Sequence, residues 1–334
     1  MTERLAILVP VLDDWESFAT LVSHLADTFA TIDATAEVIA VDDGSSEPFD
    51  ARSLAGLTGG GLTAITIVRL ATNLGHQRAI AAGLATVARR TDLDAVIVMD
   101  SDGEDRPEDI PALFAAHQRD PARAILAQRA KRSERGVFRI GYFFYKRLFR
   151  LLTGQTIDFG NFSLLPFAIV RRLVHMPELW NNLPAALIRS RVRYTPVPLA
   201  RGVRYAGQSR MNLSSLVVHG MSAMSVYTDV IFVRIIFLAG LVSGLTALAM
   251  LGVVGIRIFT DLGIPGWAST MFGNLMVILM QTLVMVIATS LVLLSGRSQR
   301  PIIPFLDAPA FIADDGTGDA ACSVSGPGAR DTSI

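Results

Sequence analysis

Two long apolar stretches near the end of the chain constrain its fold more than any other feature. Between Ile231 and Ile256 the only charged residue is Arg234, and residues 271–295 contain none. Each stretch exceeds the roughly 20 residues that a helix needs to cross a hydrocarbon core. Lipid offers no partners for uncovered backbone polar groups, so a hairpin of two transmembrane helices is expected. The alternative is a pair of buried helices in a large soluble core.

These stretches predict how the chain is divided. Residues 1–210 are expected to form the main domain and residues 211–230 an amphipathic helix at the membrane surface. The remaining segments are the spans at 231–256 and 271–295, a short outer loop at 257–270, and a disordered tail at 296–334.

Arginines indicate the orientation of this hairpin. The loop between the spans carries Arg257, balanced by Asp261, whereas the flanks on the other side carry several arginines. They are Arg201, Arg204, Arg210, Arg297 and Arg300. Cytoplasmic flanks are usually the more positive ones. The main domain is therefore expected in the cytoplasm, attached to the inner membrane by a multi-pass anchor. No secretory signal is recognised at the start, and the lone Cys322 fits a reducing compartment.

The main domain alternates between strand-like and helix-like patterns. Short β-rich runs lie at 5–9, 37–41, 64–70, 95–99 and 124–127, with helical stretches at 14–30, 76–90 and 107–119. Alternating strands and helices predict an α/β fold, a doubly wound and mostly parallel sheet with helices on both faces. A further helix at 135–152 mixes aromatic and basic residues. Such a helix could lie on a membrane surface, or it could pack one face against the core and expose the other to solvent.

Acidic residues gather where several of these strands end. Asp42 and Asp43 follow the second strand, and Asp100, Asp102 and Glu104 follow the fourth. In an open parallel sheet, ligands bind beyond the carboxyl ends of the strands. Asp42 and Asp43 could hold a nucleobase or ribose, although the sequence around them, DDGSS (42–46), is also good turn chemistry.

The pair Asp100 and Asp102 has the chemistry of a metal site. Two carboxylates at one strand end can face a single hard cation, and Mg²⁺ typically takes one or two carboxylates together with substrate phosphates. The alternative is a solvated turn followed by a helix whose amino end is capped by an acid.

Six motifs occur in order before the two spans: VPV (9–11), VDDGSS (41–46), NLGHQRAIAAGL (73–84), VMDSDGEDRPEDIP (98–111), DFGNFSLL (158–165) and RYAGQSRMNLSSL (204–216). As a set they resemble a family 2 inverting glycosyltransferase of the GT-A fold. The chain is most similar to the polyisoprenyl-phosphate group, such as dolichyl-phosphate mannosyltransferases and the glucosyltransferases of O-antigen modification. The resemblance covers about residues 5–300.

The resemblance implies a nucleotide-sugar donor, Mg²⁺ or Mn²⁺, and a polyprenyl-phosphate acceptor in the lipid bilayer. It places Pro10, Asp42, Asp43 and Asp100 near the donor nucleotide, and Asp100 and Asp102 at the metal. Four residues match phosphate-contacting positions: Arg129, Arg204, Ser209 and Arg210. The catalytic candidates are Asp102, Arg129 and Glu104. No nucleic-acid partner is expected, and a homo-oligomer is left open.

The chain departs from the family pattern at several positions. Glu104 stands where Gln is frequent, Asn161 where Asp is frequent, and Arg210 where Lys is usual. Glu104 could bind the metal, accept a proton, or cap the next helix. No Q-x-x-R-W motif of processive synthases is present, which argues against chain polymerisation.

An acceptor phosphate is already ionised at neutral pH, so it needs no strong base. A hydroxyl acceptor would need one, for which Asp158 or Glu104 are candidates. A third hypothesis is a non-catalytic membrane partner that binds nucleotide sugars.

Overall fold

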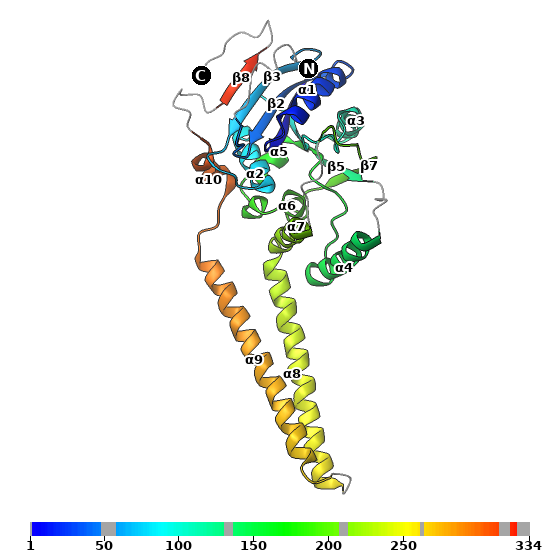
Figure 1. The fold of residues 1–334 in the computed structure, drawn as a ribbon, viewed down its shortest axis with the longest axis vertical. Coiled ribbons are helices and arrows are strands. Elements are labelled where there is room, and N and C mark those ends of the chain that lie inside the picture. The colour runs from blue at the N-terminus through cyan, green and yellow to red at the C-terminus, as the bar shows by residue number, and fades with distance from the viewer. Residues whose placement is uncertain are drawn as a thin grey trace. The chain divides into compact units, whose positions relative to one another are not determined.

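The computed structural model describes most of the chain as two compact units (Figure 1). The described residues are 2–47, 58–129, 136–206, 213–260, 264–313 and 321–325. The first unit contains Met1–Ile140, Ile157–Val226 and Ile302–Ile334, and the second contains Gly141–Thr156 and Tyr227–Pro301.

A mostly parallel sheet forms the centre of the first unit (Figure 1). Its four neighbouring parallel strands are β3 (Leu62–Arg69), β2 (Ala34–Asp42), β1 (Glu3–Val11) and β4 (Ala95–Val98). The other strands are β5 (Ala124–Arg129), β6 (Ser163–Pro166), β7 (Tyr194–Leu199) and β8 (Ala321–Ser325). Among the described residues the order is β7-β5-β6-β4-β1-β2-β3-β8, with β6 antiparallel to both neighbours and β8 antiparallel to β3.

Helices cover both faces of the sheet. On one face lie α1 (Trp15–Phe29) and α3 (Ile110–Arg119), which follows the short η2 (Pro107–Asp109). On the other lie α2 (His76–Val87), α5 (Phe167–Leu173), η3 (Pro177–Trp180) and α6 (Leu183–Arg189). Because both faces are covered, the central strands are apolar throughout, and each buried large side chain contributes about 1.5–3 kcal/mol. The doubly wound α/β sheet predicted from the sequence is confirmed.

Small residues let α2 approach the sheet closely. A Cβ added at Gly83 would lie 2.5 Å from Leu8 Cδ1 and 2.6 Å from Val41 Cγ2, so a larger residue would push the helix outward. Because α2 follows β3 in the chain, its amino end at His76 lies near the carboxyl ends of the strands.

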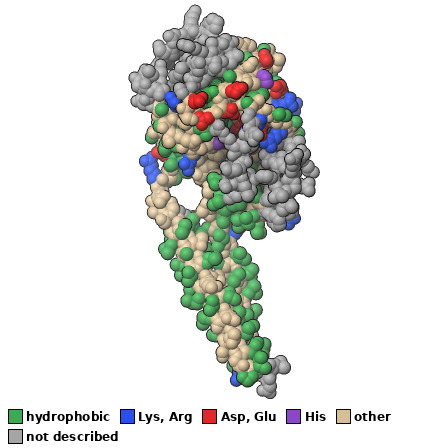
Figure 2. Space-filling model, in the orientation of Figure 1, with side chains coloured by type: hydrophobic (Ala, Val, Ile, Leu, Met, Phe, Trp, Pro, Cys, Tyr) green, Lys and Arg blue, Asp and Glu red, His purple; other side chains and the backbone are tan. Residues whose placement is uncertain are grey.

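The second unit contains two long apolar helices, α8 (Thr228–Phe259) and α9 (Trp267–Ser298). Both are long and apolar enough to cross a membrane, and hardly any of their residues are buried. The surface along them in Figure 2 is largely hydrophobic. The helices extend a few residues beyond both predicted spans. The segment before them contains α7 (Leu213–Ser225), where the sequence predicts the juxtamembrane helix.

Arg234, the single charge in the first apolar stretch, has a defined partner. Its Nη1 donates to the carbonyl oxygens of Arg150, at 3.4 Å, and Leu151, near the end of α4 (Gly136–Thr153). The rings of Phe149 and Tyr227 pack edge to face beside it, with centroids 6.0 Å apart. The Arg150 carbonyl also accepts the Gly154 N–H at 2.9 Å, so Arg234 adds a second bond to it. The bonds of Arg234 to these two carbonyls in the last turn of the helix join α4 to α8.

Residues 302–313, here called the return segment, correct one expectation. They lie in the tail that the sequence predicts to be disordered, but they form α10 (Pro304–Asp307) and η4 (Ala308–Phe311), packed against the core of the first unit. Phe305 stacks on His175 with centroids 4.6 Å apart, and Phe311 contacts Trp180. Apolar residues in the segment explain the difference, since they bury surface that a polar tail could not.

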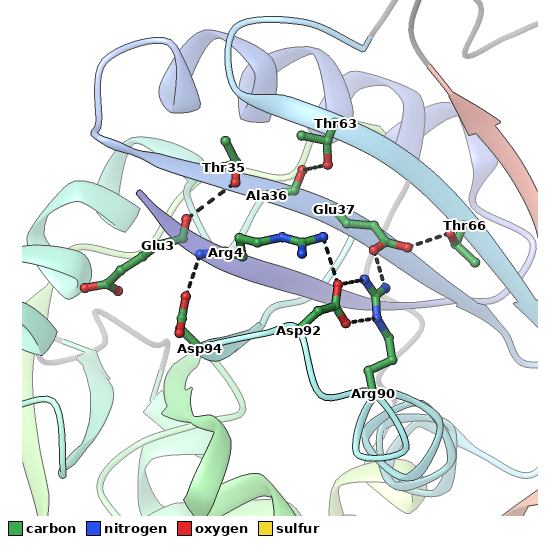
Figure 3. A network of polar contacts seen from close by, with 10 residues as sticks. All are labelled: Glu3, Arg4, Thr35, Ala36, Glu37, Thr63, Thr66, Arg90, Asp92 and Asp94. Carbon is green, nitrogen blue, oxygen red and sulfur yellow. Dashed lines mark hydrogen bonds and ion pairs between the residues drawn. The ribbon is translucent and has the colours of Figure 1, made fainter. Parts of the chain in front are cut away.

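The amino-terminal ends of the strands are joined by a polar network (Figure 3). The Arg90 guanidinium binds both carboxylate oxygens of Asp92, at 3.0 and 2.7 Å, and pairs with Glu37 of β2. Arg4 of β1 adds a second ion pair to Asp92 at 2.8 Å, and Glu37 accepts a bond from Thr66 of β3. The hydrogen bonds from Arg90 lower the pKa of Asp92 below its usual value.

Replacing Arg90 by Met should lower the free energy of unfolding by about 1 kcal/mol, since the charged hydrogen bonds are lost at a half-exposed site. A carboxylate with a lowered folded pKa stabilises above its unfolded pKa, and the effect is lost as pH falls through the folded value. The deficit of Arg90→Met should therefore fade below about pH 4. Thermal unfolding at several pH values measures it, and Arg119→Met, at an exposed position, should change little. A deficit independent of pH would contradict this account.

Replacing Phe305 by Ala should destabilise the first unit by roughly 1–2 kcal/mol, because the half-buried ring loses its contacts with His175 and with the Arg89 guanidinium, 4.9 Å from its centroid. Leu306→Ala, at a neighbouring exposed position, is the matched control. Equal unfolding midpoints for the two variants would show that the return segment does not contribute to stability.

Candidate functional site

The loops that follow β1 and β2 are bonded to each other. Asp13 has a positive φ of 49°, and its Oδ1 accepts bonds from the backbone N–H and the hydroxyl of Ser46, both at 2.8 Å. The Asp13 N–H in turn donates to Ser45 Oγ at 3.0 Å. Pro10 is buried in β1, where it is paired in register with Val41 of β2. These contacts build a rigid rim at the carboxyl ends of the two strands.

Asp42 and Asp43, the predicted nucleotide contacts, are both buried and already engaged with the protein. Asp42 accepts the Ser45 N–H at 2.8 Å and lies 3.4 Å from Arg69 Nε. Asp43 accepts the N–H groups of Leu74 and Gly75 at 2.7 and 3.0 Å. Burial raises the pKa of Asp43, although these two bonds oppose the shift. Both carboxylates therefore shape the loops of the site, including the one that begins α2.

The acidic loop, residues 100–105, is folded tightly after β4. The buried Asp105 carboxylate accepts the Asp100 N–H at 3.0 Å, and Asp102 Oδ1 accepts the Glu104 N–H at 2.9 Å. Burial raises the pKa of Asp102, and the charges of Asp100 and Glu104 add to the shift while Arg204 opposes it. The loop thus concentrates negative charge beyond the end of a buried strand.

Residues 201–205, here called the arginine segment, lie directly on the acidic loop. The Gly202 N–H donates to Glu104 O at 2.9 Å, and the Tyr205 N–H donates to Asp102 O at 3.0 Å. A Cβ added at Gly202 would lie 2.1 Å from Gly103 O, so only glycine allows this approach. Arg204 is expected from the sequence among the phosphate contacts, but its position on the acidic loop is not predictable from the sequence.

The arginine segment supplies positive charge to the acidic loop. Arg204 Nη2 lies 2.6 Å from Asp102 Oδ2, and its Nε lies 3.3 Å from Glu104 Oε1. Arg201 also pairs with Glu104. Tyr205, next in the segment, bonds His24 of α1 through its hydroxyl at 3.1 Å. Burial, with the nearby acids Glu108 and Asp102, raises the pKa of Tyr205 to about 12.

His76, which the sequence analysis did not assign a role, contacts the other side of the acidic loop. Its Nε2 lies 3.3 Å from Asp100 Oδ1 and 2.9 Å from Asn161 Nδ2. Burial disfavours the charged ring, but Asp100, Asp105 and Asp43 together outweigh it, so the pKa of His76 is raised. The signal that could have found it is its place at the start of the helix that follows β3.

Asn161 is held in a chain of hydrogen bonds. Its Oδ1 accepts from Gln77 Nε2 at 3.0 Å, and Gln77 Oε1 accepts the Leu183 N–H at 2.8 Å. An amide in this position orients His76 and Gln77 but does not act as a base.

The donor chemistry of Asp100 and Asp102 suits a hard divalent cation. Within the described ranges no group of three or more His, Cys, Asp or Glu side chains could hold a metal ion. Mg²⁺ commonly takes only one or two carboxylates and completes its shell with substrate phosphates and water. Two carboxylates therefore fit such an ion when phosphates supply further oxygens.

Three predicted phosphate contacts remain: Arg129, Ser209 and Arg210. Arg129 ends β5 at the same edge of the sheet. Ser209 and Arg210 fall outside the described residues.

Several relatives align with more than half of this chain at low identity. An uncharacterized glycosyltransferase YkcC of Bacillus subtilis is 25% identical over 79% of this chain and 80% of that protein. A dodecaprenyl-phosphate galacturonate synthase of Rhizobium johnstonii is 28% identical over 54% of this chain, and an undecaprenyl-phosphate 4-deoxy-4-formamido-L-arabinose transferase of Sodalis glossinidius is 26% identical over 64%. The chain spans 53% and 65% of the lengths of these two proteins.

A solved structure with a similar fold is glucosyl-3-phosphoglycerate synthase from Mycobacterium tuberculosis, described in complex with Mn²⁺, UDP-glucose and phosphoglyceric acid. Its TM-score is 0.49 at 16% identity, covering 69% of this chain and 80% of that one. Residues 6–174 match the model of the family described as glycosyl transferase family 2. This match covers half of the sequence and contains the acidic loop, so the chain belongs to glycosyl transferase family 2 and is a glycosyltransferase.

Proposed function

We propose that this glycosyltransferase moves a single sugar, with inversion, from a nucleotide-sugar donor to a polyprenyl phosphate at the membrane. The observation that carries the proposal is the meeting of the acidic loop with Arg201 and Arg204 at the carboxyl ends of the strands. Transfer between two phosphate-bearing substrates needs positive groups that neutralise the negative charge of both the donor diphosphate and the acceptor phosphate. Two relatives named for dodecaprenyl- and undecaprenyl-phosphate products support the choice of acceptor.

The donor lies, in this proposal, along the rim where the loops after β1 and β2 meet, beside Pro10, Asp42 and Asp43. The rim is rigid because the β1 and β2 loops are bonded to each other, so it can orient a nucleoside without rearranging. Orientation of the reacting groups is a large part of what such a site supplies.

A divalent cation, Mg²⁺ or Mn²⁺, held by Asp100 and Asp102 would neutralise charge on the departing nucleoside diphosphate. Arg204, together with Arg129, Ser209 and Arg210, contacts phosphate oxygens. Arginine suits this task because its planar fork matches phosphate geometry.

The acceptor phosphate carries about −1.5 to −2 charge at neutral pH, so its oxygen attacks the anomeric carbon without a general base. The contacts of Glu104, one of the two candidate bases for a hydroxyl acceptor, support the phosphate acceptor. Its carboxylate is occupied by ion pairs with two arginines, and the amide of Asn161 cannot serve as a base. Asp158 is the other candidate base for a hydroxyl acceptor.

The same proposal assigns the membrane arrangement. Both ends of the α8–α9 hairpin lead into the first unit, so a spanning hairpin returns to the side it left. Arginine flanks favour the cytoplasmic side of the inner membrane. The enzyme then works where a polyprenyl phosphate presents its head group.

Replacing Asp102 by Asn should reduce sugar transfer roughly 100-fold or more, because the diphosphate loses charge stabilisation in the transition state. The full chain in membranes would be incubated with polyprenyl phosphate, Mg²⁺ or Mn²⁺ and a panel of radiolabelled nucleotide sugars. Label in an organic-extractable, acid-labile lipid is the expected product. Asp109→Asn, on the neighbouring η2, should retain activity.

Three outcomes would contradict parts of the proposal. Full activity after chelation of divalent cations would contradict the metal. Label in a glycan or a lipid head-group hydroxyl would favour the hydroxyl acceptor. Donor binding without transfer for the whole panel would favour a non-catalytic binding partner.

A further inference from the structure

Glu104 joins the arginine segment to the acidic loop through both its side chain and its backbone. Its carboxylate pairs with Arg201 and with Arg204, and its carbonyl oxygen accepts the Gly202 N–H. The carboxylate is mostly buried, with 14% of the side chain exposed, so these pairs are only partly screened by water. A glutamine would supply hydrogen-bond atoms here but no charge to match two guanidinium groups.

Arg204 stands between two carboxylates that have different tasks. It contacts Asp102 at 2.6 Å and Glu104 at 3.3 Å. A divalent cation on Asp102 would compete with the guanidinium for the same oxygens and would repel it. Once displaced from Asp102, Arg204 keeps one carboxylate partner within the described contacts, Glu104.

The position of Glu104 relative to the next helix matters for its role. That helix begins at Pro107, and its amino-terminal cap position is Arg106, two residues after Glu104. The described ion pairs of the Glu104 carboxylate run to the arginine segment.

We propose that Glu104 is a positioning residue, which holds Arg204 at the acidic loop after a metal ion has taken Asp102, so that the guanidinium meets the phosphates of the substrates. This inference rests on the proposed function, because the phosphates and the metal come from it. Arg201 strengthens the attachment by sharing the same carboxylate. The charge at position 104 thus serves the arginines.

Hydrogen exchange tests the attachment without any donor. In the full chain in detergent, Glu104→Gln should speed amide exchange in the peptide that covers residues 201–206 by about tenfold, because the arginine segment opens locally more often. Glu104→Asp, which keeps the charge, should recover most of the protection. Glu178→Gln, which removes a carboxylate paired with Arg189 at 2.8 Å, should leave this peptide unchanged. Protection in Glu104→Gln equal to that of the wild type would overturn the proposal.

Binding of Mn²⁺ alone, followed by the electron paramagnetic resonance signal of the free ion, tests the exchange of partners. Arg204→Gln should bind Mn²⁺ several-fold more tightly, because Asp102 loses its competing cation. Arg106→Gln removes a nearby charge that does not contact Asp102, and its effect should be smaller. Equal effects of these two variants would show that Arg204 does not compete with the metal.

The double variant separates positioning from metal ligation. Glu104→Gln should weaken Mn²⁺ binding when Arg204 is present. Among the described contacts, Asp102 is then the one carboxylate left to Arg204, so the guanidinium competes more strongly with the ion. In the Arg204→Gln background, Glu104→Gln should reduce the affinity for Mn²⁺ by a smaller factor. An equal or larger loss there would make Glu104 a metal ligand and overturn the proposal. If no variant binds Mn²⁺, alone or with a nucleoside diphosphate added, both the proposed metal site and the exchange of Arg204 are contradicted, whereas unchanged protection of residues 201–206 contradicts the role of Glu104 alone.

Discussion

Concentrated negative charge beyond a buried strand must be balanced, and the rest of the site is arranged around this requirement. Asp100, Asp102 and Glu104 lie within five positions of one loop, where like charges repel strongly if they are partly buried. The described structure balances them with Arg201 and Arg204 on one side and His76 on the other. In the proposed function, a donor and its metal would therefore enter a set of ion pairs that already exists.

The two ends of the sheet use charge differently. At the amino-terminal ends, Arg90 and Asp92 meet through two hydrogen bonds and pair with Glu37 of β2 and Arg4 of β1, an arrangement that adds stability. At the carboxyl ends, Arg204 divides its contacts between Asp102 and Glu104, and such shared contacts can be exchanged. The same residue types thus stabilise the domain at one edge and prepare it for ligands at the other.

Local patterns were sufficient to predict much of the fold. Apolar strands alternating with helices indicated the parallel sheet, and the length of the apolar stretches indicated α8 and α9. The pairing of Arg204 with Asp102 was not predictable, because it joins residues about a hundred positions apart through a close approach at Gly202. The docking of the return segment was missed because Phe305 and Phe311 lie in a region whose average composition is polar.

The return segment has a consequence for any attempt to isolate the first unit. A chain cut before α8 would lose Phe305 and Phe311 and expose the apolar surface around Trp180 and α2 that they cover. Such a fragment would expose to solvent a hydrophobic patch that is covered in the intact chain, and it would be prone to aggregate. Joining residue 226 to residue 302 through a linker would instead remove the hairpin and keep the return segment in the chain.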